Sequence, residues 1–477
     1  MKKTVLLLLT LTSFVTFSQE LIKTLPLKLA KRTDVFQVVE ENKKQISLFF
    51  NDKFSVRTLR FNDRLELIDS LSAERPSTDY DDIIGYSTSD NNYYTYWSSS
   101  NNKEIASQCF NFTTKQVSLK KFTLEFVKEK PIKRITVNNV FYLITILKNT
   151  SILNFYVFKN GQMEKKTIDL TDKTFINWEN KKINLWDMVN EFSQFQPALA
   201  IQNMLDETPP SLTFSANKRK AYVNGNSLIF TFDCNRNFTQ FLNFNLDDFT
   251  VTQKSYAQPY IEATEFISED SNSFLMNNKI VQMKLNQDVM HLIIKDLDDN
   301  EIKTYDVLAD QEIAIKNSEI IQENGKISNT RILDKSNQLL RKIYNLNPSI
   351  SCYTFNDKIY LTLGSVSLVQ DNNAALYGGM IGGFTGALIG AAISSNYSVN
   401  NLNSYAKRKV VYINCLFDSN FNHIDGAMKK LAFDELRGFA DQKNYLVSQT
   451  VFRFNSGLYF GGYDKENSTY SFYKFKD

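Results

Sequence analysis

The stretch "AYVNGNSLIFTF", residues 221–232, decides the fold. Two runs rich in apolar and β-branched residues flank the dipeptide Asn224-Gly225, which is a strong short-range signal for a β-hairpin. A type I′ turn needs a positive φ at both central residues, and asparagine and glycine tolerate that conformation best. The stretch therefore predicts two antiparallel strands joined by a tight turn at Asn224 and Gly225.

The same pattern recurs along the chain. Further copies turn at Asn138-Asn139, Asn277-Asn278, Asn356-Asp357 and Asn455-Ser456, and two looser copies lie near Asn42 and Asn91-Asn92. Most copies are followed by two more strand-like runs, so the predicted unit is four antiparallel strands, here named A, B, C and D. Its spacing of about 45–50 residues matches the blades of propellers. Seven hairpins predict seven blades.

The two ends of the chain complement each other. The seventh copy stops after its C strand, and a spare run, "LIKTLPLKLAKR" at residues 21–32, precedes the first A strand. If that run supplies the missing D strand, the ring closes without an open edge. The chain thus resembles the β-propeller superfold, although no WD, Kelch or Asp-box signature identifies a family. The resemblance implies an all-β fold, a seven-bladed β-propeller of four-stranded antiparallel blades. Two β-sandwiches are the alternative.

Extra residues interrupt the repeat at 173–211, 310–348 and 366–408, with a smaller excess at 426–442. Each lies in a B–C or D–A connection, and these connections leave a four-stranded antiparallel blade from the same face. We therefore expect partly helical insertions on one face of the ring. Loops held on a rigid scaffold often carry binding.

One insertion contains an aromatic stripe. In "NLWDMVNEFSQF", residues 184–195, Trp186, Phe192 and Phe195 fall at helical spacing and Asn184 is placed to cap the helix. Residues 197–205 could extend this helix. The stripe could form the wall of a ligand site; packing of the helix on its own scaffold is the alternative.

A glycine-rich segment, "LYGGMIGGFTGALIGAAIS" at residues 376–394, lies inside the third insertion. As a helix it would carry a stripe of small residues, which permits close approach of two backbones. It resembles glycine-zipper segments of bacterial envelope proteins. Both ends must return to one blade, which disfavours a simple membrane crossing. Three uses remain open: packing on a protein partner or second copy, shallow or pore-like membrane insertion, and packing on the propeller itself. The predicted contact residues are Gly378, Gly382, Gly386, Gly390, Phe384 and Leu388.

The N-terminus predicts export. Lys2 and Lys3 precede the apolar run "TVLLLLTLTSFVTF", and small residues favour cleavage after Ser18. Residues 1–18 would then be a signal peptide and 19–477 the propeller domain; an uncleaved anchor is the alternative. We expect a protein of the periplasm, the outer cell envelope or the medium; whether the glycine-rich segment also associates it with a membrane is one of the uses left open above.

The cysteines predict no disulfide. The strand assignment places Cys352 and Cys415 on the A and C strands of one blade, two ladder spacings apart. A disulfide does not bridge Cα atoms more than about 7 Å apart. Cys109 and Cys234 belong to other blades, so all four thiols are expected to be free.

No pattern indicates catalysis or a cofactor. His291 and His423 show no metal-ligand spacing, and nucleophile, phosphate and dinucleotide motifs are missing from the sequence. "DLDDNE", residues 296–301, begins like a calcium loop but lacks its glycine and distal glutamate. "DYDDIIG", residues 79–85, offers paired carboxylates for acid–base work or, more simply, a solvated loop. A net charge of +3 with interspersed signs predicts no nucleic-acid partner.

These observations favour an exported, non-enzymatic binding or assembly module of the bacterial cell envelope. Its decorated face would bind, and the glycine-rich helix would dock to a protein partner, to a second copy or to the membrane. The alternatives are a propeller-type enzyme acting on extracellular glycan or peptide and a membrane-anchored sensor domain.

Overall fold

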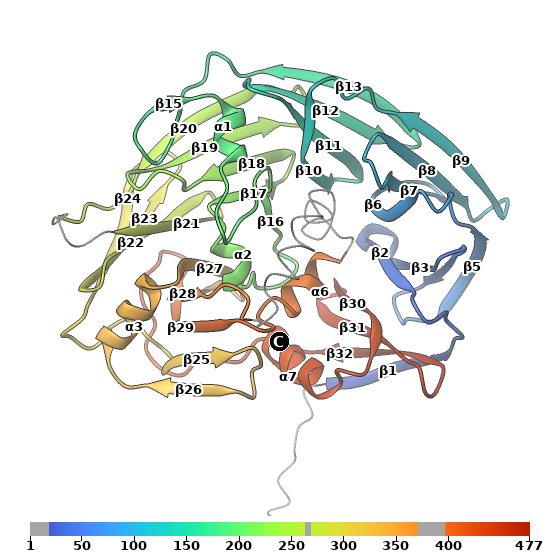
Figure 1. Ribbon diagram of the computed structural model, residues 1–477. Helices are drawn as coiled ribbons and strands as arrows, with labels where there is room; N and C mark the ends of the chain where they lie inside the picture. The colour runs from blue at the N-terminus through green and yellow to red at the C-terminus, as the bar shows by residue number, and fades with distance from the viewer. Residues whose placement is uncertain (1–18, 263–268, 371–395) are drawn as a thin grey trace, which may run out of the picture.

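The computed structural model describes residues 19–262, 269–370 and 396–477. Seven antiparallel sheets surround a common centre (Figure 1), which confirms the predicted seven-bladed propeller. Blades one to three follow the predicted order from the innermost strand outwards. They contain β2 (Asp34–Glu40), β3 (Gln45–Asn51), β4 (Ser55–Phe61), β5 (Leu67–Glu74), β6 (Tyr80–Ser89), β7 (Asn92–Ser99), β8 (Glu104–Asn111), β9 (Gln116–Thr123), β10 (Glu129–Val137), β11 (Val140–Leu147), β12 (Ile152–Lys159) and β13 (Gln162–Asp169).

Blades four and five continue this order, and blade four has an additional short strand on its inner side. That strand is β16 (Gln202–Met204), which pairs in parallel with β17. The two blades contain β17 (Arg219–Asn224), β18 (Ser227–Phe232), β19 (Phe238–Asn245), β20 (Val251–Ala257), β21 (Asp270–Met276), β22 (Lys279–Leu285), β23 (Val289–Asp296) and β24 (Glu301–Leu308).

The N-terminal strand closes the ring, as the sequence predicts. Blade seven consists of β30 (Val447–Phe454), β31 (Gly457–Asp464), β32 (Thr469–Phe475) and, outermost, β1 (Gln19–Pro26). Aromatic pairs then join this blade to blade one: the ring centroids of Phe50 and Tyr470 lie 5.1 Å apart and those of Phe61 and Phe472 lie 5.3 Å apart. The first and last blades therefore share one core.

Blade six departs from the predicted strand order. The expected D strand after the C strand does not form, because only an isolated bridge between Phe417 and His423 follows it. The outer positions are filled instead from the preceding insertion, by β25 (Ile320–Asn324) and β26 (Thr330–Leu333), next to β29 (Lys409–Asp418), β28 (Lys358–Val366) and β27 (Asn347–Phe355). An outer strand needs only an antiparallel neighbour, so a segment that precedes the A strand can occupy the place of D.

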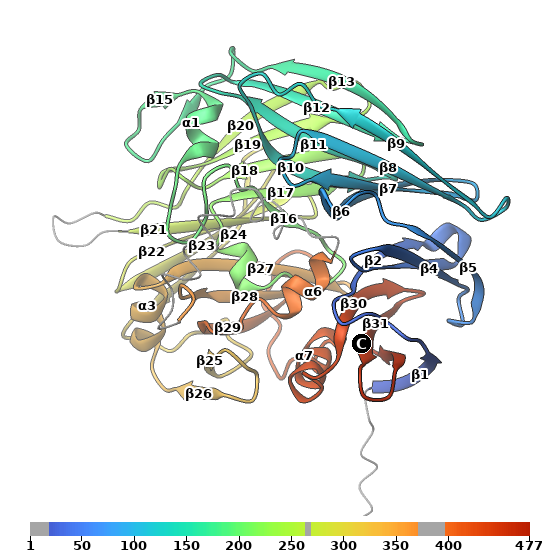
Figure 2. The ribbon, with the colours of Figure 1, turned by 45° about the vertical axis from the view of Figure 1, so that its right-hand side comes forward.

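The insertions form short helices and one small hairpin. Figures 1 and 2 both show α7 between blades six and seven, where its apolar side packs on blade seven. The helix α3 packs on the strands of blade six. The insertion elements are β14 (Phe175–Ile176), β15 (Lys182–Ile183), α1 (Leu185–Asn190), α2 (Leu212–Ser215), α3 (Ser336–Tyr344), α6 (Tyr397–Leu402) and α7 (Ala432–Gln442), and the 3-10 turn η1 (Glu41–Lys43) joins β2 to β3.

Two local predictions need correction. Asn224 pairs with Ser227, so the turn of that hairpin is centred on Gly225 and Asn226, one residue later than expected. Only Gly225 has a positive φ, of 57°, as expected when glycine takes the first central position of a type II′ turn. The proposed helix over residues 197–205 is also wrong, because α1 ends at Asn190 and part of that range forms β16.

Candidate functional site

The centre of the ring is occupied by two insertions. The first, residues 202–217, runs down the inner side of blade four as β16 and turns back towards β17 through α2. The second, residues 396–405, contains α6 and also lies inside the ring (Figure 1). We call these two segments together the plug.

Asn401 joins the two segments of the plug. This side chain is 2% exposed. Its Oδ1 accepts a hydrogen bond from the backbone N–H of Ser211 (2.8 Å), and its Nδ2 donates to Thr208 Oγ1 (3.0 Å) and to the carbonyl of Pro209 (2.8 Å). These three hydrogen bonds join α6 to the residues just before α2, so each segment of the plug holds the other in place.

Further contacts repeat this link along the plug. The backbone N–H of Leu212 donates to the Tyr405 hydroxyl (3.0 Å), and Ser398 Oγ donates to Glu207 Oε2 (3.0 Å). The rings of Phe214 and Tyr397 lie 5.2 Å apart. The plug is therefore held by both polar and aromatic contacts.

The plug is also attached to the ring on several sides. Ser349 Oγ of blade six donates to the carbonyl of Leu212 (2.8 Å), and Arg453 Nε of blade seven donates to the carbonyl of Glu207 (2.8 Å). Asn396 Nδ2 donates to the carbonyls of Val35 in blade one and Gln449 in blade seven, both at 3.0 Å. The channel of this propeller is thus bridged from blade four to blades one, six and seven.

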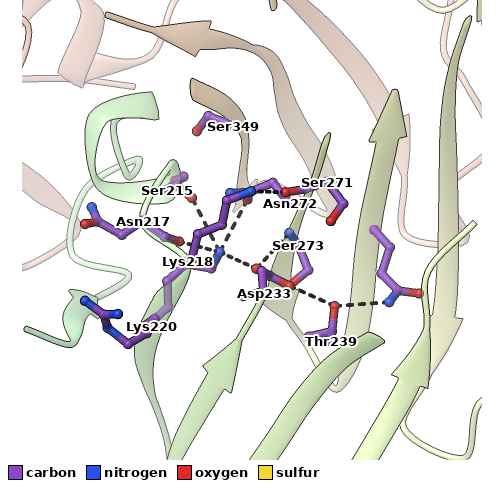
Figure 3. A network of polar contacts seen from close by, with 12 residues as sticks. Ser215, Asn217, Lys218, Lys220, Asp233, Thr239, Ser271, Asn272, Ser273 and Ser349 are labelled. Carbon is purple, nitrogen blue, oxygen red and sulfur yellow. Dashed lines mark hydrogen bonds and ion pairs between the residues drawn. The ribbon is translucent and has the colours of Figure 1, made fainter. Parts of the chain in front are cut away.

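A buried ion pair next to α2 supports the plug (Figure 3). Lys220 Nζ lies 2.7 Å from Asp233 Oδ2, and neither side chain is exposed. The same ammonium donates to the carbonyl of Asn217 (2.9 Å), while Asp233 accepts from Thr239 Oγ1 (2.8 Å) and from Ser273 Oγ (2.9 Å). The network therefore fixes the end of the plug to blades four and five.

Burial and charge oppose each other in this pair. Burial alone would raise the pKa of Asp233, but the Lys220 ammonium and the hydrogen-bond donors hold that pKa below its usual value. Burial lowers the pKa of Lys220, and Asp233 opposes that shift. We regard the pair as ionised, because each charge has its counter-charge and further hydrogen-bond partners.

Arg219, which lies between Lys218 and Lys220, secures the part of the chain that precedes β16. Its side chain donates to three carbonyls there: from Nε to Ala200 (3.1 Å), from Nη1 to Glu191 (2.7 Å) and from Nη2 to Pro197 (2.6 Å). Lys218 forms a more open ion pair with Asp270 at 2.8 Å. This role of residues 218–220 was not predicted from the sequence. The available signal was three consecutive cations at the start of a strand that follows a long insertion.

The three aromatic residues predicted as a ligand wall lie in different environments. Trp186 is 7% exposed and belongs to the core of blades three and four. Phe195 is half-buried, with the Arg408 guanidinium 5.5 Å from its ring centre. Phe192 is 71% exposed. The structure brings none of these three rings together on one surface.

The predicted contact residues of the glycine-rich segment lie outside the described residues. They are Gly378, Gly382, Phe384, Gly386, Leu388 and Gly390. Their flanks are described: the N–H of Gln370 donates to the carbonyl of Lys407 (2.7 Å), and Asn396 is bound at the mouth of the channel. The chain passes through α6 before it rejoins blade six, and β28 and β29, the strands on either side of the segment, are neighbours in that blade, as predicted. Within the residues that the structure describes, none of the helices has the length and apolar character needed to cross a membrane.

The residues considered for metal or acid–base chemistry are placed as follows. Asp296 Oδ1 accepts from the N–H groups of Asp298 and Asn300, so the candidate calcium loop is a closed side-chain-to-backbone turn. Over residues 19–262, 269–370 and 396–477, no group of three histidine, cysteine, aspartate or glutamate side chains is placed to hold a metal. Burial raises the pKa of Asp82, an acidic residue of "DYDDIIG", and the negative charge of Asp34 in blade one raises it further. The four cysteines are free, and Leu361 separates Cys352 from Cys415 in the ladder, as predicted.

Exposed apolar side chains are distributed unevenly over the ring. Among the described residues, thirteen large apolar side chains are exposed, and none of them lies in an A–B or C–D turn. Five lie on outermost strands: Leu21, Leu67, Ile68, Leu119 and Ile332. The other eight lie in B–C or D–A connections: Phe54, Val127, Trp178, Phe192, Tyr260, Leu368, Val369 and Tyr445. We call the face formed by these connections the insertion face.

Comparison with known proteins identifies no family. No family model matches the sequence, and no curated protein matches it. Solved structures with similar chains include a protein of Bacteroides fragilis (11% identity, 83% of this chain and 95% of that one, TM-score 0.28). Others are a protein of Lactobacillus plantarum (7%, 70% and 79%, 0.25) and an apocarotenoid oxygenase variant of Synechocystis (8%, 58% and 62%, 0.29). Likenesses this distant say nothing of function, and the assignment of the chain as a seven-bladed β-propeller rests on its own sheets.

Proposed function

We propose that this protein is an exported, non-enzymatic binding and assembly module of the bacterial cell envelope, and that it binds a protein partner through the insertion face. The observation that carries the proposal is the distribution of exposed apolar side chains. Among the described residues, the insertion face has eight of them, whereas the tight turns of the opposite face have none. Exposed apolar residues gathered on one side of a protein are typical of interaction surfaces.

The contacts that hold the insertions in place are consistent with a binding role. Arg219, the pair of Lys220 and Asp233, and Asn401 hold the insertions in one conformation through buried polar contacts. A surface fixed before binding loses less conformational entropy when a partner docks. Rigid insertions on a closed ring therefore suit recognition of a protein.

Export and envelope location rest on the N-terminal sequence. Lys2, Lys3 and the apolar run that follows have the form of a signal peptide. Cell fractionation tests this part of the proposal. The full chain is expected in the envelope or the medium and in a form lacking the first 18 residues, whereas deletion of residues 2–18 should leave it in the cytoplasm. A full-length cytoplasmic product of the intact gene would contradict export.

Site-specific crosslinking tests the binding face. A photoreactive amino acid would replace Phe192 or Tyr260, which are both highly exposed on the insertion face. The matched controls carry it at Asn277 or Asp357, in A–B turns of the opposite face. In intact cells we expect one discrete crosslinked species from the first pair alone. Equal products from both pairs, or none from the insertion face, would contradict the proposal.

A further inference from the structure

We propose that one edge of blade six binds the anionic headgroups of a lipid membrane. This edge, which we call the basic edge, consists of Arg331, Arg341, Lys342 and Lys409. The inference goes beyond the proposed function, because it adds a membrane contact to a surface that is proposed to bind protein.

Strand register and helix packing bring the four cations together. Arg331 pairs with Gln322, which pairs with Val411, and Lys409 lies two residues before Val411 on β29. Residues two apart on a strand share a face, so Arg331 and Lys409 project from the same side of blade six. The helix α3, which carries Arg341 and Lys342, packs on strands β27, β28 and β29 of this blade. Ser365 Oγ donates to the carbonyl of Lys342 (3.2 Å) and fixes the end of α3 at this edge.

The basic edge has no anionic partner among the described residues. No ion pair involves any of its four side chains in that part of the chain. Arg331 and Arg341 are exposed, and Lys342 and Lys409 are half-buried. Burial lowers the pKa of Lys342, and Lys409, Arg331 and Arg341 lower it further. Like charges gathered without counter-charges favour a bound polyanion.

Apolar residues at the same edge favour lipid over a soluble polyanion. The N–H of Ser367 donates to the carbonyl of Lys409 (2.8 Å), so Leu368 and Val369 follow directly beside the basic edge. Their side chains are 38% and 37% exposed. Their chain continues into the apolar sequence of residues 376–394. Basic residues next to exposed apolar ones are the pattern of proteins that rest on anionic membrane surfaces.

Vesicle flotation tests this inference. The chain from residue 19 onward would be mixed with phosphatidylcholine vesicles that contain or lack phosphatidylglycerol, which serves as the anionic probe. We expect binding to the anionic vesicles alone, weakened by added salt because screening reduces the attraction. The variant R331Q/R341Q/K342Q/K409Q should bind more weakly by about fivefold for each residue replaced.

Controls keep the test specific. The matched variant K44Q/K279Q/K303Q/K358Q removes four lysines beside the tight turns of the opposite face and should bind vesicles like the unaltered protein. If the four-residue variant of the basic edge does not fold, R331Q/R341Q changes only exposed side chains and should weaken binding about 25-fold.

Three outcomes would overturn the inference: no binding to anionic vesicles, equal loss in the two variants, or binding to heparin or single-stranded DNA without binding to vesicles. The in-cell crosslinks from Phe192 and Tyr260 are an independent readout. If they persist while vesicle binding fails, the membrane contact is wrong and the protein-binding function stands.

Discussion

The side-chain amide of Asn139 forms two hydrogen bonds with the backbone of Thr88. Its Oδ1 accepts from the Thr88 N–H and its Nδ2 donates to the Thr88 carbonyl, both at 2.6 Å. Asn139 lies in the A–B turn of blade three and Thr88 in the A strand of blade two. Other asparagines at the A–B turns each donate a hydrogen bond to the following blade: Asn224 to Asn278 (2.8 Å), Asn277 to Thr354 (2.9 Å) and Asn138 to Gly225 (3.1 Å). The recurrent asparagines therefore join neighbouring blades as well as turning the chain.

This link can be measured with Asn139→Gly. Asn139 has a φ of 65°, which glycine adopts readily, so the change removes the two hydrogen bonds without straining the turn. The N–H and C=O of Thr88 lose their partner, and we expect the free energy of unfolding to fall by about 1–3 kcal/mol. Urea unfolding followed by tryptophan fluorescence would report it.

Ser456→Gly is the matched control for that substitution. Ser456 also occupies an A–B turn with a positive φ, of 60°, and its side chain makes none of the inter-blade hydrogen bonds found in the described part of the chain. Glycine should be neutral or slightly stabilising there. An equal loss of stability in both variants would show that the turn conformation, and not the link between blades, is responsible.

The buried pair beneath the plug predicts an asymmetry between two neighbouring lysines. Lys220→Met leaves the Asp233 carboxylate fully buried without its counter-charge, which should destabilise the protein by about 3–5 kcal/mol. Lys218→Met breaks the partly exposed pair with Asp270 and should cost about 1 kcal/mol or less. Comparison of the two unfolding midpoints in urea checks the assignment. Similar midpoints would mean that the Lys220 network does not support the plug.

A second buried carboxylate gives a pH-dependent prediction. Glu323 is unexposed; burial raises its pKa, and Arg437, whose guanidinium pairs with it, opposes the rise. Arg437→Met should raise that pKa further. Because a carboxyl whose pKa is higher in the folded state favours folding when protonated, the destabilisation should be largest at pH 7–8 and shrink as the pH falls towards about 4.3.

The control for the pH dependence is the double variant E323Q/R437M, in which the Glu323 carboxylate is absent. Its stability relative to the unaltered protein should depend less on pH than that of R437M, because Glu323 no longer titrates. Thermal unfolding at several pH values measures both variants. If R437M shows no change with pH, Glu323 is not the group that loses its partner.

Trp186 and Phe192 offer a test within one predicted stripe. Trp186→Ala removes a ring from the shared core of blades three and four, which typically costs about 3–5 kcal/mol. Phe192→Ala changes a ring that is 71% exposed and should stay within about 0.5 kcal/mol of the unaltered protein. Thermal shift assays separate the two effects. A small loss for Trp186→Ala would indicate that this ring faces a site and not the core.

One regularity of the fold could have been predicted from the sequence but was not. At four C–D corners, and at the corner that follows the C strand of blade six, an asparagine or aspartate accepts backbone N–H groups two or more residues later; the residues are Asn62, Asn111, Asn245, Asp296 and, in blade six, Asp418. This turn chemistry is local, because a short polar side chain bonds the backbone two residues on. The motif would have identified "DLDDNE" as a corner without reference to calcium.

The sequence alone determined the repeat. The asparagine hairpins and the alternating strands are local patterns within each four-stranded blade, and the spare N-terminal strand supplies the one strand that the last blade lacks. Tertiary structure alone decided which segment became the outer strand of blade six and how the insertions fill the channel. The sequence of β25 is compatible with several antiparallel edges, and only the folded structure places it beside β29. Asn401 likewise finds Ser211 190 residues away, a contact that no spacing in the sequence encodes.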